Sequence, residues 1–205
     1  MSIKRRESWG SPGDVPDDVV WCESDREVAD ALLVDDRPVG VAAGDLARTL
    51  GASGRGVTGV EVGLDMIEVE YEASGRSHTV WAVAHCIVRT SRWRGGWWRG
   101  PIDVVMNAQF VSDLDVAPRG HPNDGRCEWI SVDAAMTMRQ RWAAWRRLPR
   151  GEHVPHPLIR TRSVTEASGS RRCVLAVDGS DIGVVDAWRA CLHPDHASVW
   201  VATTA

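Results

Sequence analysis

From about residue 57 onward the chain is a series of short segments in which apolar and polar residues alternate, and this pattern restricts the fold more than any other feature. Alternation with a period of two residues predicts strands with one buried face. Turns rich in glycine, serine or proline separate the segments. We therefore expect a mainly β (α+β) fold, a β-sandwich or distorted barrel with one inserted helix, preceded by a short α/β segment.

The pattern divides the chain into three parts. Residues 1–20 are rich in Gly, Pro, Ser and charge and predict a flexible arm. Residues 21–56 predict a short α/β segment, in which Ser24 caps a helix. Residues 57–205 predict the β domain. Its first long segment changes the phase of its alternation at Ile67, which predicts a β-bulge there.

The inserted helix is expected after Asp133, which is a suitable N-cap. Met138, Trp142 and Trp145 follow at helical spacing and share one face. Two interpretations stay open: the tryptophans pack inward beneath a solvated helix face, or they lie at a surface.

The same helix opens a strongly basic stretch, because residues 139–172 contain nine arginines and only two acidic residues. Guanidinium groups beside indoles suit an anionic lipid surface. We expect Arg139, Arg146 and Arg147 to bind lipid phosphate. Three tryptophans in one glycine loop form a second patch with three arginines, and their exposure would be meaningful; the six residues are Arg92, Trp93, Arg94, Trp97, Trp98 and Arg99.

Overall composition limits which classes of partner the protein can bind and in which cellular compartment it can work. The net charge of −4 argues against nucleic-acid binding. No apolar run approaches the roughly 20 residues of a membrane-spanning helix. Five scattered cysteines without a C-x-x-C pair indicate reduced thiols. We expect a cytoplasmic protein, peripheral to the inner membrane face through anionic lipid, that can form a homo-oligomer.

Two histidine pairs have i, i+3 spacing, His153 with His156 and His193 with His196. Zinc would need two further ligands, and a proline lies between the partners of each pair. A zinc site is therefore not predicted.

The segment "HPNDG", residues 121–125, has the residue types of a tight turn, since asparagine and aspartate bond their own backbone and glycine tolerates positive φ. The strand-like "CEWISV" follows it. We expect a hairpin turn here, with Asp124 shaping it.

Three elements in this order resemble the diacylglycerol kinase-like lipid kinases, a superfamily that includes the sphingosine and ceramide kinases. They are "FVSDLDVAPRGHPNDGRCEWISV", "MRQRWAAWRRLPRGEHVPHPLIRTRSV" with its G-x-H, and "VLAVDGSDIG" followed by "LHPDHASVWV". Together they cover about residues 105–203. In some members of the family the first turn binds a divalent cation, so the resemblance makes Asp124 a candidate magnesium ligand, with Asp113 and Asp115 nearby.

The resemblance implies a nucleotide domain with a "GGDGT" loop that binds ATP with magnesium. Here residues 21–56 are a remnant of that domain, and Gly44 and Asp45 are the candidate nucleotide-binding residues within "VAAGDLARTLG". Ala43 and Leu46 replace glycines that would let the backbone approach phosphate, and we expect their side chains where ligand oxygens would sit.

In the same family the aspartate of a "DGE" hairpin is the proposed general base, and Asp178 matches it. Ser180 stands where the glutamate would be, and an Asp-Gly turn alone would explain Asp178 equally well. The resemblance therefore implies a kinase relative. The expected function is a degenerate member that binds lipid or regulates; the alternatives are an active ATP-dependent transferase and a protein-interaction module without lipid chemistry.

Overall fold

Two β-sheets form the framework of residues 10–203, which are the residues that the computed structural model describes, the side chain of Arg92 excepted. Sheet A has the order β1–β4–β15–β3–β2, with β5 paired to β4 and β12 paired to β15. Its strands are β1 (Gly10–Asp14), β2 (Val20–Cys22), β3 (Val39–Val41), β4 (Thr58–Ala73), β5 (Arg76–Ala82), β12 (Glu166–Gly169) and β15 (Ala187–Ala202). The mainly-β prediction is confirmed.

Sheet B has the order β11–β10–β7–β6–β13–β14 and is antiparallel throughout. Its strands are β6 (His85–Arg89), β7 (Ile102–Met106), β10 (Cys127–Val132), β11 (Ile159–Val164), β13 (Cys173–Val177) and β14 (Ser180–Val185). A small hairpin, β8 (Phe110–Val111) and β9 (Leu114–Asp115), stands apart from both sheets. Neither sheet closes into a barrel within the described residues.

The helices are α1 (Asp25–Val34), α2 (Asp45–Leu50) and α3 (Met138–Trp145), with short 3-10 turns η1 (Arg92–Arg94) and η2 (Leu148–Arg150). The Ser24 side chain accepts the Glu27 N–H, as its predicted capping role requires. Helix α3 begins later than expected. Thr137, not Asp133, is its N-cap, because Thr137 and Gln140 form a reciprocal capping box.

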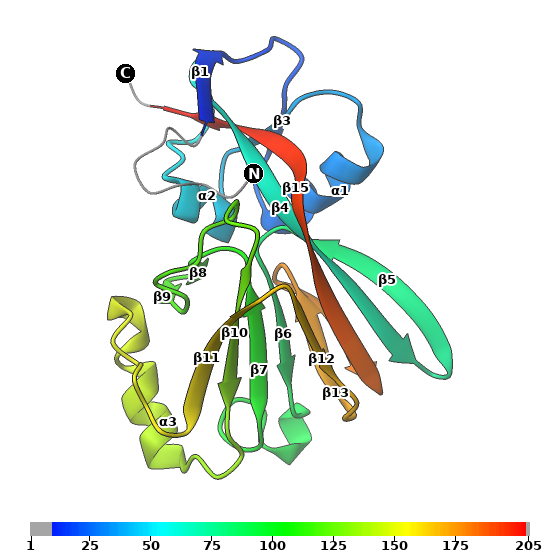
Figure 1. Cartoon of the computed structure of the whole chain (residues 1–205), viewed down its shortest axis with the longest axis vertical. Coiled ribbons are helices and arrows are strands. Elements are labelled where there is room, and N and C mark those ends of the chain that lie inside the picture. The colour runs from blue at the N-terminus through cyan, green and yellow to red at the C-terminus, as the bar shows by residue number, and fades with distance from the viewer. Residues whose placement is uncertain (1–9, 204–205) are drawn as a thin grey trace.

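The two long strands β4 and β15 run side by side through both parts of the molecule (Figure 1). Near α1 and α2, β4 buries Val62, Leu64 and Met66 in one core. Beyond that point it buries Ile67 and Val69 in a second core, against sheet B. The buried face of β4 therefore changes between Met66 and Ile67, because different layers cover the two halves of the strand.

The bulge expected at Ile67 lies instead in the partner strand. His193 of β15 is opposite Met66, and Ala197 is opposite Leu64, so β15 holds extra residues where β4 changes its buried face. Asp195, within this bulge, has a φ of 49°. The extra residues let β15 change its buried face together with β4.

The two ends of the described chain join the same sheet. Within the expected arm, residues 10–14 pair with β4 as β1; residues 1–9 lie outside the described residues. Strand β3 pairs in parallel with β15, and β2 pairs in parallel with β3. The segment that contains α1 and α2 is thereby attached to the last strand of the chain.

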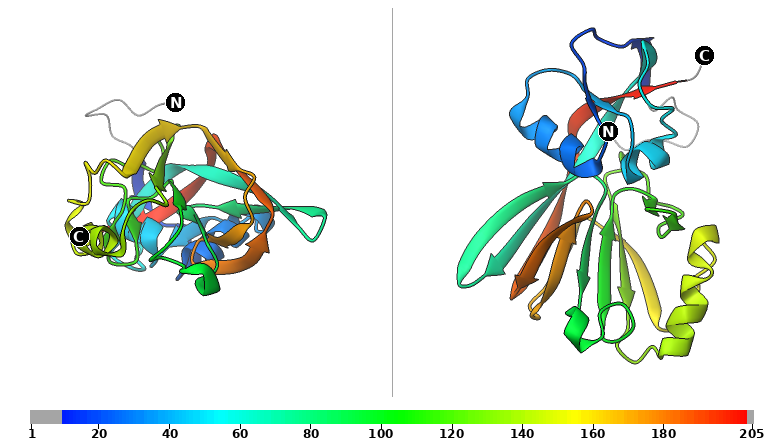
Figure 2. Two further views of the ribbon diagram at one scale, coloured as in Figure 1. Left: turned by 90° about the horizontal axis from the view of Figure 1, so that it is seen from below. Right: turned by 180° about the vertical axis from the view of Figure 1, so that it is seen from behind.

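Sheet B is covered on both faces. Its inner face packs on β4, β5 and β15. Helix α3 lies along its outer face, clearly separated from sheet A (Figure 2). A third core fills this outer layer and includes Ile87, Val104, Met106 and Ile130 of sheet B with Met136 before α3. One end of sheet B therefore contacts α2, where His85 of β6 lies beside Asp45. The outer face of the sheet is covered by α3.

Candidate functional site

Asp178 occupies the tight turn between β13 and β14. Asp178 and Gly179 both have positive φ, 46° and 76°, which is the conformation of a two-residue type I′ turn. The Asp178 carboxylate accepts backbone N–H groups from Val83 (2.9 Å), Ala84 (3.0 Å) and His85 (2.9 Å). It is buried, and burial raises its pKa to about 6 in spite of these three hydrogen bonds. The carboxylate therefore fixes the connection between β5 and β6.

Gly44 and Asp45, the candidate nucleotide-binding residues, lie at the start of α2. The first backbone N–H groups of that helix are bonded to a side chain of the chain itself. Asp25 Oδ2 accepts the Asp45 N–H and Asp25 Oδ1 accepts the Leu46 N–H, both at 2.9 Å. A Cβ at Gly44 would lie 2.5 Å from Asp25 Oδ1, so glycine is needed for this carboxylate to approach. A carboxylate of the protein thus binds N–H groups of the kind that bind phosphate.

The expectation for Leu46 was wrong in its geometry. Its side chain is fully buried in the core beneath α1 and α2, and it does not face the helix end. Asp25 supplies the obstruction instead.

His85 contacts both Asp178, through its backbone N–H, and Asp45, through its side chain. Its Nδ1 is 3.7 Å from Asp45 Oδ2, and this nitrogen has no hydrogen-bond partner within the described residues. Burial lowers the His85 pKa, although Asp45 and Asp25 act in the opposite direction. Burial likewise raises the pKa values of Asp25 and Asp45. The structure thus brings two predicted residues, Asp45 and Asp178, to one buried histidine that the sequence reasoning did not select.

The Asn-Asp-Gly turn at Asp124 forms as predicted, but the expected hairpin is wrong, because β9 before the turn pairs with β8 and β10 after it pairs with β7 and β11. Asp124 Oδ1 accepts the Arg126 N–H at 2.9 Å, and Gly125 has a φ of 74°. Its main support is Asp65, a fully buried residue that sequence reasoning missed. Asp65 accepts the N–H groups of Gly125 and Asp195, each at 2.8 Å. The sequence did contain a signal for Asp65, because it is an acidic residue within the apolar part of a predicted strand.

No group of three or more His, Cys, Asp or Glu residues that could hold a metal ion occurs among residues 10–203. Asp113, a suggested co-ligand, is in the hairpin of β8 and β9, where it pairs with Arg48 at 3.2 Å. Asp124 and Asp65 are occupied by backbone donors. The described residues give magnesium no cluster of oxygen ligands at this turn.

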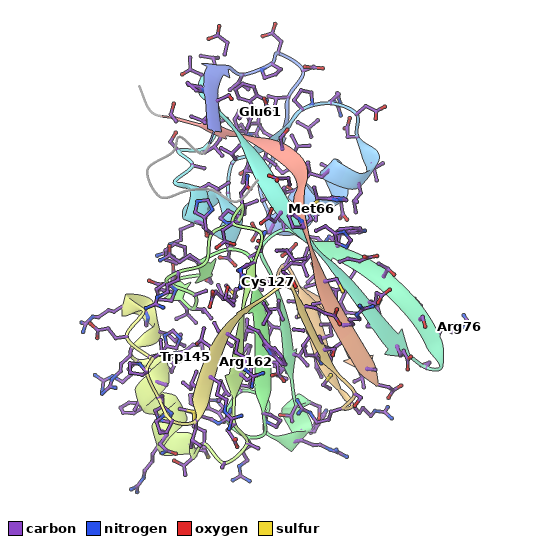
Figure 3. The ribbon with its side chains drawn as sticks, viewed as in Figure 1. Glu61, Met66, Arg76, Cys127, Trp145 and Arg162 are labelled. Atoms are coloured by element: carbon purple, nitrogen blue, oxygen red, sulfur yellow. The ribbon has the colours of Figure 1, made fainter. Side chains whose placement is uncertain are left out.

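An apolar cavity of about 320 Å³ lies between α3 and the outer face of sheet B. Trp97, Trp98 and Trp145 line it and are also 41–45% exposed, so the cavity reaches the surface between them. Figure 3 shows Trp145 on α3. Aliphatic side chains line most of the remainder: Ile87, Ile102, Val104, Val111, Leu114, Val116, Ile130, Val132, Met136, Ala144, Leu148 and Ile159. Such a cavity has the composition of a site for an apolar ligand.

Arg141 connects α3 to the tryptophan loop. Its buried guanidinium donates to the carbonyls of Met136 (3.0 Å), Asp133 (3.1 Å), Trp97 (3.0 Å) and Gly100. The solvated-face interpretation of α3 therefore fails for this arginine, since its backbone bonds hold the rim of the cavity together.

The other residues of α3 form an exposed surface. Trp142 is 54% exposed and Met138 52%, so these side chains do not pack inward. The Arg146 guanidinium lies 4.9 Å from the Trp142 ring centroid. Trp98 and Trp145 have ring centroids 6.5 Å apart, which joins the two predicted patches. We call this the Trp/Arg surface; its members are Trp93, Trp97, Trp98, Arg139, Trp142, Trp145, Arg146 and Arg147, all exposed.

Among residues 10–203, none of the helices has the length and apolar character to span a bilayer. No protein-family model matches the sequence, and no curated protein matches it.

Solved structures give a clear match. Three structures described as diacylglycerol kinases from Bacillus anthracis str. Sterne superpose on 90% of this chain and on 75–77% of their own chains. Their TM-scores are 0.60, 0.57 and 0.59, at 10% sequence identity. The chain therefore has the fold of the diacylglycerol kinase-like structures, as the resemblance of its sequence motifs implied.

Proposed function

We propose that this chain is a diacylglycerol kinase-like protein that keeps a lipid-binding surface and does not transfer phosphate. The observation that carries the proposal is the apolar cavity beneath α3, which reaches the surface between Trp97, Trp98 and Trp145. An acyl chain inserted there would bury hydrocarbon against aliphatic side chains, and burial of apolar surface is the main favourable term in such binding.

The residues around the opening suit a membrane surface. Half-exposed indoles are amphipathic and sit well at headgroup level. Arg139, Arg146 and Arg147 are exposed beside them, and guanidinium groups bind phosphate through a planar set of donors. Together these features support peripheral binding to anionic lipid.

Two contacts argue against phosphoryl transfer. The Asp25 carboxylate already holds the N–H groups at the start of α2, and a nucleotide phosphate there would face this negative charge. Asp178, the candidate base, is buried and accepts three backbone N–H groups. A general base must reach the proton that it removes, and Asp178 has no free access to a lipid hydroxyl.

Vesicle co-sedimentation tests the proposal. The chain should sediment with phosphatidylglycerol vesicles and much less with phosphatidylcholine vesicles, and high salt should weaken the binding because it screens exposed charges. A variant with Arg139, Arg146 and Arg147 all changed to Glu should lose binding and keep its melting temperature, since the three side chains are exposed.

The matched control changes Arg37, Arg55 and Arg76 to Glu. These arginines are exposed on other parts of the molecule, and the change in net charge is the same. The control should still bind. Equal loss in both variants would mean that only total charge matters. Failure of the unmodified chain to bind any vesicle would favour a protein partner for the Trp/Arg surface.

A further inference from the structure

His153 is the one lining residue of the cavity, within the described part of the chain, that has a buried polar atom without a partner. The His153 side chain is 6% exposed, and its Nδ1 neither accepts nor donates a hydrogen bond within the described residues. Arg141, the other ionisable lining residue, is committed to four backbone carbonyls. Buried polar groups are almost always hydrogen-bonded, so the exception calls for a missing partner.

The contacts of the ring indicate which partner is missing. The Val116 backbone acts to raise the pKa of the ring, as a carbonyl that accepts the ring N–H does, and Nδ1 is the nitrogen left without a partner. Burial lowers the His153 pKa, although Asp115 nearby acts in the opposite direction. A neutral imidazole carries one N–H, and here the backbone carbonyl takes it. Nδ1 is then a bare acceptor, and its missing partner is a hydrogen-bond donor.

The volume limits the size of the partner. Ligand cavities run from roughly 300 to 1,000 Å³, and this one, at about 320 Å³, is near the lower limit. It has room for one hydrocarbon chain with a small head, whereas a lipid with two chains buried together would need more space.

We propose that the cavity takes a single-chain lipid whose head group donates a hydrogen bond, and that this head donates to Nδ1 of His153. The inference rests on the proposed lipid-binding function and adds a specificity residue to it. Apolar walls reject water and charged groups, while the single acceptor selects for an O–H or N–H. A site built around one buried polar atom discriminates strongly against an analogue that leaves the atom unpaired.

Two isomers separate the hydrogen bond from hydrophobic burial. 1-Octanol and 1-methoxyheptane have the same atoms, but only the alcohol has an O–H. Binding to the full chain is measured by intrinsic tryptophan fluorescence, because three tryptophans line the cavity. We expect 1-octanol to bind about tenfold more tightly, the effect of one hydrogen bond to a buried acceptor. Octanamide, which donates through N–H, should share this advantage over the ether.

The His153→Phe variant keeps a ring and removes the acceptor, so the two isomers should bind it equally. His153→Gln retains an acceptor oxygen and should restore part of the preference; it also serves if the phenylalanine variant does not fold. His78→Phe, which changes an exposed histidine on β5, should behave as the unmodified chain does.

The outcomes distinguish the two proposals. If neither isomer binds the unmodified chain, the cavity is no apolar site and the proposed function fails with it. If both isomers bind equally, the lipid-binding function stands and the role of His153 is overturned. Persistence of the alcohol preference in His153→Phe would also overturn that role.

Discussion

Asp178 and His85 hold each other by two reciprocal hydrogen bonds. The His85 N–H donates to Asp178 Oδ1 at 2.9 Å, and the Asp178 N–H donates to the His85 carbonyl at 3.0 Å. The same carboxylate bonds two more N–H groups of the preceding residues. Asp178, which the sequence resemblance made a candidate base, thus joins the turn between β13 and β14 to the connection between β5 and β6.

Removal of this joint should be costly. In Asp178→Ala, three buried N–H groups lose their acceptor, and alanine must adopt a positive φ. We expect a loss of about 4 kcal/mol in the free energy of unfolding, measured by urea denaturation. Asp178→Asn should lose about half as much, because asparagine tolerates this φ and keeps one acceptor oxygen. A loss below about 1 kcal/mol in the alanine variant would indicate a carboxylate free for chemistry.

The raised pKa of Asp178 predicts a pH dependence. Burial raises it from 3.8 to about 6, so the folded state holds this proton more tightly than the unfolded state does. The contribution of Asp178 to stability is complete below about pH 4 and is lost as the pH rises through about 6. The stability of the wild type relative to Asp178→Asn should therefore fall between pH 4 and pH 7.

The comparison with Asp178→Asn is needed because other buried groups titrate nearby. Asp25 and Asp45 have raised pKa values and act in the same direction as Asp178. His85 and His153 have lowered pKa values, so their contributions are lost as the pH falls. A difference between the two proteins that does not vary with pH would contradict the prediction.

Asp25 predicts the response to nucleotide. Its carboxylate occupies the first N–H groups of α2, so calorimetric titration with ATP and magnesium should show no binding tighter than about millimolar. Micromolar binding would favour an active transferase and would contradict the proposed function.

The same contact can be tested through stability. Asp25→Asn places an amide where two backbone donors need acceptors, and we expect a loss of about 2 kcal/mol in the free energy of unfolding. The matched control is Asp30→Asn on the same helix, where the side chain is exposed and pairs with Arg26. That variant should change stability little. Equal effects would mean that Asp25 does not stabilise the start of α2.

The sequence predicts where the strands and helices of this fold lie along the chain better than it predicts how they pack into layers. Alternation and turn residues correctly locate most strands, and Ser24 correctly caps α1. The change in apolar–polar alternation at Ile67 can be seen in the sequence, but its cause cannot. Two different layers cover β4 on opposite faces, and such long-range packing leaves no local pattern that differs from a bulge.

The candidate site shows the same limit. The Asp-Gly turn at 178 and the Asn-Asp-Gly turn at 123–125 follow from local chemistry and were predictable. The carboxylates of Asp25 and Asp65 bond backbone groups at sequence separations of 20 to 130 residues. In the sequence Asp25 is indistinguishable from any acidic residue in the first turn of a helix. Only the folded chain reveals its contact with α2.

Arg141 should support the opening of the cavity. Arg141→Met removes the donors for four carbonyls and should lower the free energy of unfolding by about 3 kcal/mol. It should also expose the tryptophan loop, which acrylamide quenching of fluorescence would detect. Arg139→Met, an exposed neighbour on α3, is the control and should change neither property. Quenching that stays unchanged in Arg141→Met would show that the loop does not depend on this arginine.

The turn at Asp124 gives a final prediction, on divalent cations. Asp124 bonds only the Arg126 backbone N–H among the described hydrogen bonds, and asparagine can accept the same bond. Asp124→Asn should therefore melt as the wild type does, and millimolar magnesium or calcium should shift neither protein. Asp65→Asn is the contrasting variant. Its carboxylate accepts two N–H groups while fully buried, so we expect a loss of about 2 kcal/mol. A cation-dependent rise in melting temperature that disappears in Asp124→Asn would show that the carboxylate binds an ion, because a ligand that binds only the folded state stabilises it.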